Sequence, residues 1–116
     1  RDLPPDVLFA RRAHAGDLAS WALALARLGR LDEARPHAEQ ALATHRALQA
    51  MAEGDELHKR ELALALVATA WADPGRARDR LGEARTVFDT MPADARALRA
   101  SRWIDGLIVE AQRTLR

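Results

Sequence analysis

The stretch from Leu28 to Leu42 constrains the fold most, because it contains a helix end, a tight turn and the start of a second helix. Leu28 closes an apolar run at helical spacing, and Gly29 can adopt the positive φ at which many helices end. Asp32 and Glu33 place negative charge where a helix dipole begins. The next helix carries small side chains at Ala34, Ala38 and Ala41. Such side chains let two helix backbones approach closely, so the stretch predicts a helical hairpin whose two helices pack closely together. We call the contact surface formed by these alanines the alanine seam.

Composition favours an all-α fold. Apolar residues make up 48% of the 116 residues and aromatic residues only 4%. Alanine and leucine dominate the apolar fraction, which suits closely packed helices better than a sheet. A chain of this length buries roughly two-thirds of its unfolded surface, enough for one core. We therefore expect a single domain over residues 1–116.

Charge and cysteine content exclude several functional classes. The net charge of +1 provides no global field that would collect nucleic acid or anionic lipid. The absence of Cys excludes disulfides and thiol nucleophiles, and it fits a cytoplasmic protein. No apolar run approaches the ~20 residues of a membrane span. Because the chain begins at Arg1 without Met, we expect it to be excised from a longer protein.

The first predicted hairpin covers residues 5–52. Its first helix runs to about Leu28, and Gly16 lowers its stability by ~1 kcal/mol relative to Ala. A break between His14 and Asp17 is therefore the alternative. The second helix begins near Asp32, and we expect Pro36 to cost little there because early amides lack intrahelical partners. The stripe of residues that this helix is predicted to bury in the core is Leu31, Ala34, Ala38, Ala41, Leu42, His45, Leu48 and Ala52.

A second hairpin is predicted over 55–91, followed by a final helix over 94–115. Leu57, Leu62, Leu64, Leu66, Val67 and Trp71 surround most of the helix over 56–71, which predicts a central, buried helix. Asp73 and Pro74 provide the start signal for the fourth helix. Its stripe is predicted at Ala77, Leu81, Ala84, Phe88 and Met91. The fifth helix is predicted to bury Leu98, Ser101, Ile104, Ile108 and Ala111.

The pattern Gly-x-Leu-Asp-Glu-Ala over 29–34, with Ala38 and then Ala41-Leu42, resembles the tetratricopeptide repeat. Ala77 occupies the place of Ala34 in a second, weaker repeat, whose turn over 72–75 lacks the pattern. The resemblance implies antiparallel hairpins stacked in a right-handed solenoid of about five helices. The last helix is either the capping helix that often ends such arrays or half of a further repeat. The resemblance also implies a non-catalytic interaction module, like the arrays appended to bacterial signalling and regulatory proteins.

Tetratricopeptide arrays bind protein segments on the concave face formed by the first helix of each hairpin. The branch that grips a C-terminal carboxylate uses paired Asn and Lys, but this chain has no Asn and one Lys, so we do not expect that mode. Carried over to this chain, the resemblance places in the concave face Ala19, Leu23, Ala26, Arg27, Lys59, Leu62, Leu66 and Thr69.

Three residues near the end of the chain form a second candidate for partner binding. Arg96, Arg99 and Trp103 share one face of the predicted final helix, and apolar residues take the adjoining face. One interpretation is that Trp103 packs onto the neighbouring helix or onto a continuation of the array beyond this chain, because Trp is highly buried on average. The other is that Trp103 anchors a peptide whose carboxylates meet the two arginines, since Trp and Arg dominate interface energies. The expected partner is then an acidic protein or peptide segment.

The histidines do not form a recognisable site. His37 and Glu33 lie one turn apart, but no third metal ligand shares their face. His14 and His45 fall on apolar stripes and are expected to be interior. The sequence also lacks a phosphate-binding loop and a nucleophile motif. We therefore expect no enzymatic activity, no metal and no cofactor.

Two other functional classes stay open. In one, the exposed end of the array or the Trp103 face pairs with a second copy and gives a homodimer. In the other, the arginines converge in one patch that binds nucleic acid or a small ligand.

Overall fold

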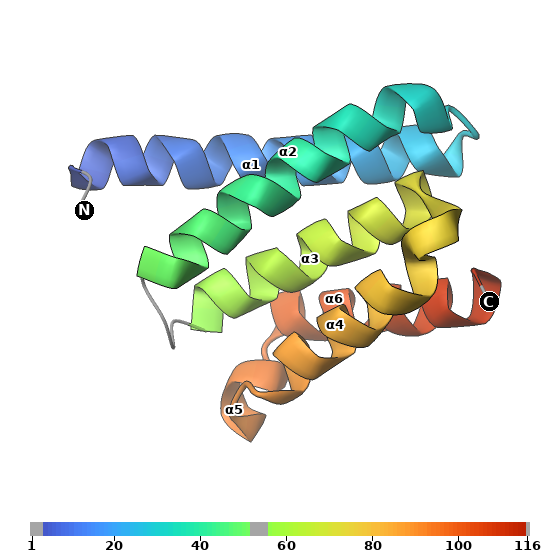
Figure 1. Cartoon of the computed structure of the whole chain (residues 1–116). Coiled ribbons are helices and arrows are strands. Elements are labelled where there is room, and N and C mark those ends of the chain that lie inside the picture. Colours follow the sequence, from blue (N-terminus) through green and yellow to red (C-terminus); the bar gives the residue numbers. More distant parts are fainter. Residues whose placement is uncertain (1–3, 52–55, 116) are drawn as a thin grey trace.

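The computed structural model describes residues 4–51 and 56–115, and almost all of them are helical (Figure 1). No strand is present in these two ranges, so the predicted all-α class is confirmed. The elements are α1 (Pro5–Arg27), α2 (Leu31–Met51), α3 (Glu56–Ala72), the 3₁₀ turn η1 (Pro74–Arg76), α4 (Ala77–Asp89), α5 (Ala93–Arg96) and α6 (Arg99–Thr114).

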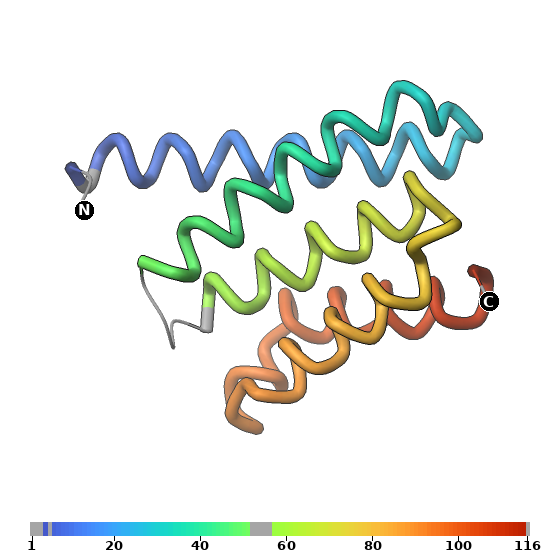
Figure 2. Tube along the Cα trace, in the orientation of Figure 1, coloured from blue at the N-terminus to red at the C-terminus, as the bar shows by residue number. Residues whose placement is uncertain are grey.

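The helices are arranged around α3. α1 and α2 form one hairpin, and α3 and α4 form the next. α3 also packs against α1, α2 and α6, while α6 packs against α4 as well. Figures 1 and 2 show α2 crossing in front of α1 and α4 lying in front of α6. None of the described helices is long and apolar enough to cross a membrane.

The turn between α1 and α2 forms as predicted. Gly29 has a φ of 81°. The Gly29 amide donates to the Ala26 carbonyl and the Arg30 amide donates to the Leu25 carbonyl, each at 2.9 Å. This pair of bonds is a Schellman motif, which satisfies carbonyls that the last turn of a helix otherwise leaves free.

The prediction of one long first helix is confirmed, because α1 continues through Gly16 without the alternative break between His14 and Asp17. The expectation for Pro36 is wrong, because Pro36 lies inside α2, in its second turn. Amides in that turn do have intrahelical partners, so Pro36 leaves the carbonyl of Asp32 without its helical donor. Asp32 is exposed, which allows water to bond that carbonyl.

Burial of α3 is close to complete. Every residue from Leu62 to Ala70 is buried, which confirms the predicted central helix. The stripes predicted for α2 and α4 are also confirmed, with buried side chains at Ala34, Ala38, Ala41, Leu42, His45 and Leu48 of α2 and at Ala77, Leu81, Ala84, Phe88 and Met91 after α3. Leu31 is only half-buried, and Ala52 lies outside the described residues.

Asp73 does not cap the element that follows it. Its side chain accepts no capping hydrogen bond, and its carboxylate instead lies 3.7 Å from the Arg76 guanidinium. The backbone carbonyl of Asp73 accepts from the Arg76 amide at 2.9 Å, which closes the 3₁₀ turn before α4.

The predicted final helix over 94–115 is two helices. Leu98, with φ −62° and ψ 147°, is extended and separates α5 from α6. This turn directs Leu98 away from the face that α6 packs on α3, so Leu98 is 56% exposed where burial was predicted. Ser101, Ile104, Ile108 and Ala111 are buried as predicted.

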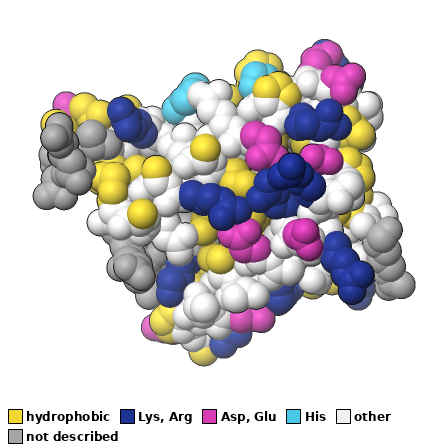
Figure 3. Space-filling view, in the orientation of Figure 1, with side chains coloured by type: hydrophobic (Ala, Val, Ile, Leu, Met, Phe, Trp, Pro, Cys, Tyr) yellow, Lys and Arg dark blue, Asp and Glu magenta, His cyan; other side chains and the backbone are white. Residues whose placement is uncertain are grey.

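The face formed by α2 and α4 is covered by interleaved charges (Figure 3). Arg46 of α2 pairs with Glu83 of α4 at 2.9 Å, and Glu39 of α2 pairs with Arg80 of α4 at 3.4 Å. Because these arginines are matched by carboxylates, this face offers little net charge to a polyanion.

Two buried histidines lie in the core. His45 of α2 is interior as predicted, together with His58 of α3, whereas His14 is exposed, contrary to expectation. Burial, with smaller contributions from His58 and Arg12, lowers the pKa of His45 from 6.5 to about 4. The charge of Arg12 is shared with Glu61, whose carboxylate lies 3.3 Å away. His45 therefore folds in its neutral form.

The first prediction concerns the alanine seam. Ala38 has no exposed surface, so Ala38→Leu should overpack the contact between α1 and α2 and lower the free energy of unfolding by about 1–3 kcal/mol. Urea unfolding measures this change, and Ala43→Leu on the exposed side of α2 is the matched control. Equal stability of the Ala38→Leu chain and the wild type would place Ala38 outside the seam.

The second prediction concerns acid stability. The folded-state pKa of His45, about 4, lies below its unfolded value of 6.5, so the unfolded chain binds more protons between these pH values. The stability contributed by neutral His45 is therefore full above pH 6.5 and is lost as the pH falls toward 4, by up to about 3 kcal/mol. In the His45→Gln variant this titration is absent, whereas the carboxylates titrate as they do in the wild type. The difference between the two proteins therefore reports the contribution of His45. Parallel curves of unfolding free energy against pH for the two proteins would contradict the assignment.

Candidate functional site

A surface pocket lies between α1 and α6. It has a volume of about 270 Å³, and its lining residues are Ser20, Leu23, Ala24 and Arg27 of α1 and Trp103 of α6. This volume is slightly smaller than that of typical small-molecule pockets, which begin near ~300 Å³. It suits one or two side chains of a larger partner. We call it the Trp103 pocket.

The wall formed by α1 consists of small side chains. Ala13, Gly16, Ser20 and Ala24 recur every three or four residues and so share one side of the helix. A Cβ atom added at Gly16 would meet nothing within 4 Å, so the space above this wall is open. A partner backbone can therefore approach α1 closely.

The wall formed by α6 carries an exposed aromatic ring between charged residues. Arg99, Trp103 and Glu110 are separated by four and then seven residues, which places them on one side of α6. Trp103 is 54% exposed. Trp103 is therefore not buried by a neighbouring helix within the described residues, and packing onto a continuation of the array stays a prediction. The opposite side of α6 faces α4, where Asp105 pairs with Arg85 at 2.8 Å.

Between these walls lies one edge of α3. Contacts on both flanks fix its orientation, since Glu61 pairs with Arg12 of α1 and Arg60 Nη1 donates to Ser101 Oγ of α6 at 3.3 Å. The α3 residues on this edge, at helical spacing, are Leu57, Arg60 and Trp71, whereas Leu64, which shares their spacing, is buried. We call the combined surface the Trp103 face, and it consists of Ala13, Gly16, Ser20, Leu23, Ala24, Arg27, Leu57, Arg60, Trp71, Arg99, Trp103 and Glu110.

An ion pair spans the Trp103 face. Arg27 Nη2 of α1 donates to Glu110 Oε1 of α6 at 2.5 Å. The Arg27 guanidinium also lies 5.4 Å from the ring centroid of Trp71 on α3, within the range of a cation–π contact. Three helices thus contribute to one small cluster, which lies beside the Trp103 pocket. We call this ion pair the Arg27–Glu110 clasp.

Some of the predicted partner-binding residues meet in this place. Leu23, Arg27 and Trp103 line the same pocket, and Arg99 lies one turn before Trp103 on α6. Arg96 does not share that side, because it belongs to α5 and the turn at Leu98 separates the two helices.

The predicted contribution of α3 needs correction. Leu62 and Leu66 are 2% and 0% exposed, so they belong to the core and offer no surface to a partner. Thr69 is also buried and donates to the Leu66 carbonyl at 2.8 Å. Lys59 lies on a different side of α3 from Arg60 and the edge that faces α1 and α6. The residues expected from the resemblance to the tetratricopeptide repeat thus lie on the side of α3 that packs in the core. Ala19 and Ala26 of α1, which were expected in the same face, are also buried.

Among the residues that sequence reasoning missed are Trp71 and Glu110, the two that contact Arg27 on the Trp103 face. Trp71 was assigned to the core, but it is only half-buried and lies under Arg27. Glu110 received no role. Leu57 and Trp71 share one side of the helix, and their spacing could have indicated a second exposed edge. Glu110 gains its role only through a contact with a distant helix.

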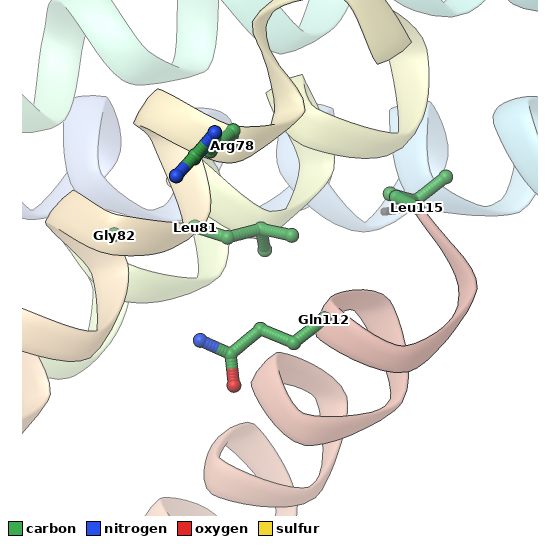
Figure 4. A pocket seen from close by; sticks show the side chains of 5 residues that line it. All are labelled: Arg78, Leu81, Gly82, Gln112 and Leu115. Atoms are coloured by element: carbon green, nitrogen blue, oxygen red, sulfur yellow. The ribbon is translucent and has the colours of Figure 1, made fainter.

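Larger pockets lie elsewhere on the described surface. One, of about 490 Å³, lies between α4 and α6, and Figure 4 shows Leu81 and Gly82 facing Gln112; Arg78 and Leu115 also line it. Another, of about 410 Å³, lies between α1 and α2 and includes Arg11, His14 and Met51. A third, of about 540 Å³, lies at α5 and includes Asp94 and Leu98. None of these pockets contains a paired acid and base, so none suggests a catalytic site.

The structure brings no metal ligands together. Within residues 4–51 and 56–115, no group of three or more His, Asp or Glu side chains could hold a metal ion. His37 stacks on the ring of Trp21 with centroids 4.6 Å apart. Glu33 accepts instead from Arg30 at 2.5 Å, so the pair considered from sequence does not converge.

Comparisons of the chain with protein-family models, with curated proteins and with solved structures found no match. The resemblance to the tetratricopeptide repeat therefore rests on the sequence alone, specifically in the first hairpin and more weakly in the second.

Proposed function

We propose that this chain is a non-catalytic protein–protein interaction module that binds an acidic segment of a partner on the Trp103 face. The observation that carries the proposal is an exposed Trp103 at a pocket that also contains Arg27, on a surface with small side chains around it. Trp and Arg are the residue types that most often dominate interface energies.

Shape supports an extended or helical segment as the ligand. The small side chains of Ala13, Gly16 and Ser20 allow a backbone to lie close to α1, and the pocket beside them accepts an apolar side chain. Trp103 then covers that side chain from α6. This arrangement buries aromatic area and needs no rearrangement of the core.

Charge supports an acidic ligand. Arg60 and Arg99 have no carboxylate partner among the described residues, and both lie along the Trp103 face. The two carboxylates of this face and its flank, Glu61 and Glu110, are already paired with arginines. The face is therefore net positive, and complementary charge on a partner increases both the association rate and the specificity.

The order of helix packing supports the proposed architecture. α3 contacts both helices of the hairpin before it, and α6 contacts both α3 and α4. Stacked tetratricopeptide hairpins have this order of neighbours, with first helices on one side of the array and second helices on the other. We therefore propose a short right-handed solenoid that serves a bacterial signalling or regulatory protein in the cytoplasm, on the strength of the sequence resemblance.

Self-association is the second candidate function. Phe9 is 71% exposed near the start of α1, and Val7 and Met51 are also exposed at that end of the first hairpin. A homodimer through these apolar side chains would raise the apparent mass in light scattering across a concentration series.

Nucleic-acid binding is less favoured, because most described arginines of α2 and α4 are paired with carboxylates.

The third prediction tests Trp103 as an anchor. A displayed peptide library selected on the folded chain should enrich segments with acidic residues beside an apolar one. Trp103→Ala should weaken their binding by roughly thirty-fold or more, because truncating an anchor costs at least ~2 kcal/mol. Thermal unfolding of the same variant should change little, since Trp103 is 54% exposed.

Trp21→Ala is the matched control for this experiment. Trp21 is 55% exposed and stacks on His37, away from the Trp103 face, so its removal should leave peptide binding intact. Selected peptides that bind Trp103→Ala as tightly as the wild type, or a selection that enriches basic segments, would overturn the proposed function.

A further inference from the structure

The Arg27–Glu110 clasp covers part of the surface that the proposed function needs. Arg27 lies over the ring of Trp71, and Glu110 holds it there from the opposite wall. Trp71 is half-buried beneath this pair, and its Nε1 atom has no hydrogen-bond partner among the described residues. The second aromatic ring of the Trp103 face is thus shielded by a contact between surface side chains.

We propose that Glu110 occupies the position of a carboxylate from the bound segment, and that binding transfers Arg27 from Glu110 to that carboxylate. This inference rests on the proposed function and specifies the ligand further. The bound segment carries an Asp or Glu side chain next to an apolar side chain, so that the carboxylate takes Arg27 while the apolar group enters the Trp103 pocket. Glu110 is then an internal competitor that sets the affinity for acidic segments.

The exposure of the clasp makes such an exchange inexpensive. The side chains of Arg27 and Glu110 are 39% and 52% exposed, so both already contact water and release of Glu110 uncovers no buried charge. Exposed ion pairs contribute little to folding stability, and the fold does not depend on this one. The incoming carboxylate replaces an equivalent interaction, so the number of charge pairs is unchanged.

The position of the clasp distinguishes it from the other ion pairs of the chain. Arg46–Glu83 and Arg80–Glu39 join α2 to α4 on the opposite face, and Arg85–Asp105 joins α4 to α6. Among the ion pairs of the described residues, only the clasp contains a residue that lines the Trp103 pocket. Its loss therefore changes the lining of the Trp103 pocket directly, while loss of the others does not.

The first experiment uses the free chain and needs no ligand. The indole N–H signals of the three tryptophans are assigned by NMR, and the hydrogen-exchange rate of Trp71 is compared in the wild type and in Glu110→Gln. We expect faster exchange of Trp71 and a shifted Arg27 Nε–H signal in the variant. Glu83→Gln is the matched control, because it breaks the similarly exposed Arg46 pair on the other face. Unchanged Trp71 and Arg27 signals in Glu110→Gln would overturn the clasp.

The second experiment tests the exchange itself with a defined ligand. The probe is a capped helical peptide of Leu and Glu, and its twin carries Gln in place of every Glu. We expect Glu110→Gln to bind the acidic peptide about three- to tenfold more tightly than the wild type does, and to bind the neutral twin with unchanged affinity.

The outcomes separate the two proposals. Equal affinity of the wild type and Glu110→Gln for the acidic peptide, with binding that still depends on Trp103, overturns the exchange and leaves the proposed function standing. Failure of the acidic peptide to shift the Arg27, Trp71 and Trp103 signals in either protein overturns both.

Discussion

Burial of α3 on nearly every side is the constraint on which the rest of the structure depends. Its residues from Leu62 to Ala70 are all buried, so α1, α2, α4 and α6 must each present an apolar surface to it. The alanines of α2 allow the first hairpin to be thin enough for both of its helices to reach α3. What the four neighbours leave uncovered is the edge that carries Leu57 and Trp71, and this edge becomes the floor of the Trp103 face.

The sequence predicted those elements that depend on local signals. Gly29 marked the first turn because a positive φ and two short-range hydrogen bonds determine its geometry. The break at Leu98 was missed because neither Gly nor Pro stands there, and the apolar spacing on its two sides resembles one continuous helix. The rotation of α3 was also missed. A helix that is apolar all round has almost no preferred side, so its sequence does not indicate which edge faces solvent.

The candidate site was predictable only in part for a related reason. Trp103 stood out because a large aromatic residue carries recognisable binding chemistry at any exposed position, whereas Arg27 was chosen only through the resemblance to the tetratricopeptide repeat. Glu110 did not, since an isolated glutamate on a helix is ordinary, and its significance comes from contact with Arg27, 83 residues earlier in the chain. Contacts between distant helices are set by packing on α3, and no local pattern in either helix reveals them.

Native-state hydrogen exchange tests the central claim, that α3 is the common support of both hairpins, most directly. If it is, the amides from Leu62 to Ala70 exchange only through global unfolding, with the same free energy as denaturant unfolding. Amides of α1 and α6 exchange with equal or lower free energies, because each covers only one side of α3. The account would be contradicted if the free energy of the opening that lets α3 amides exchange were lower than the free energy of the opening that lets α1 and α2 amides exchange.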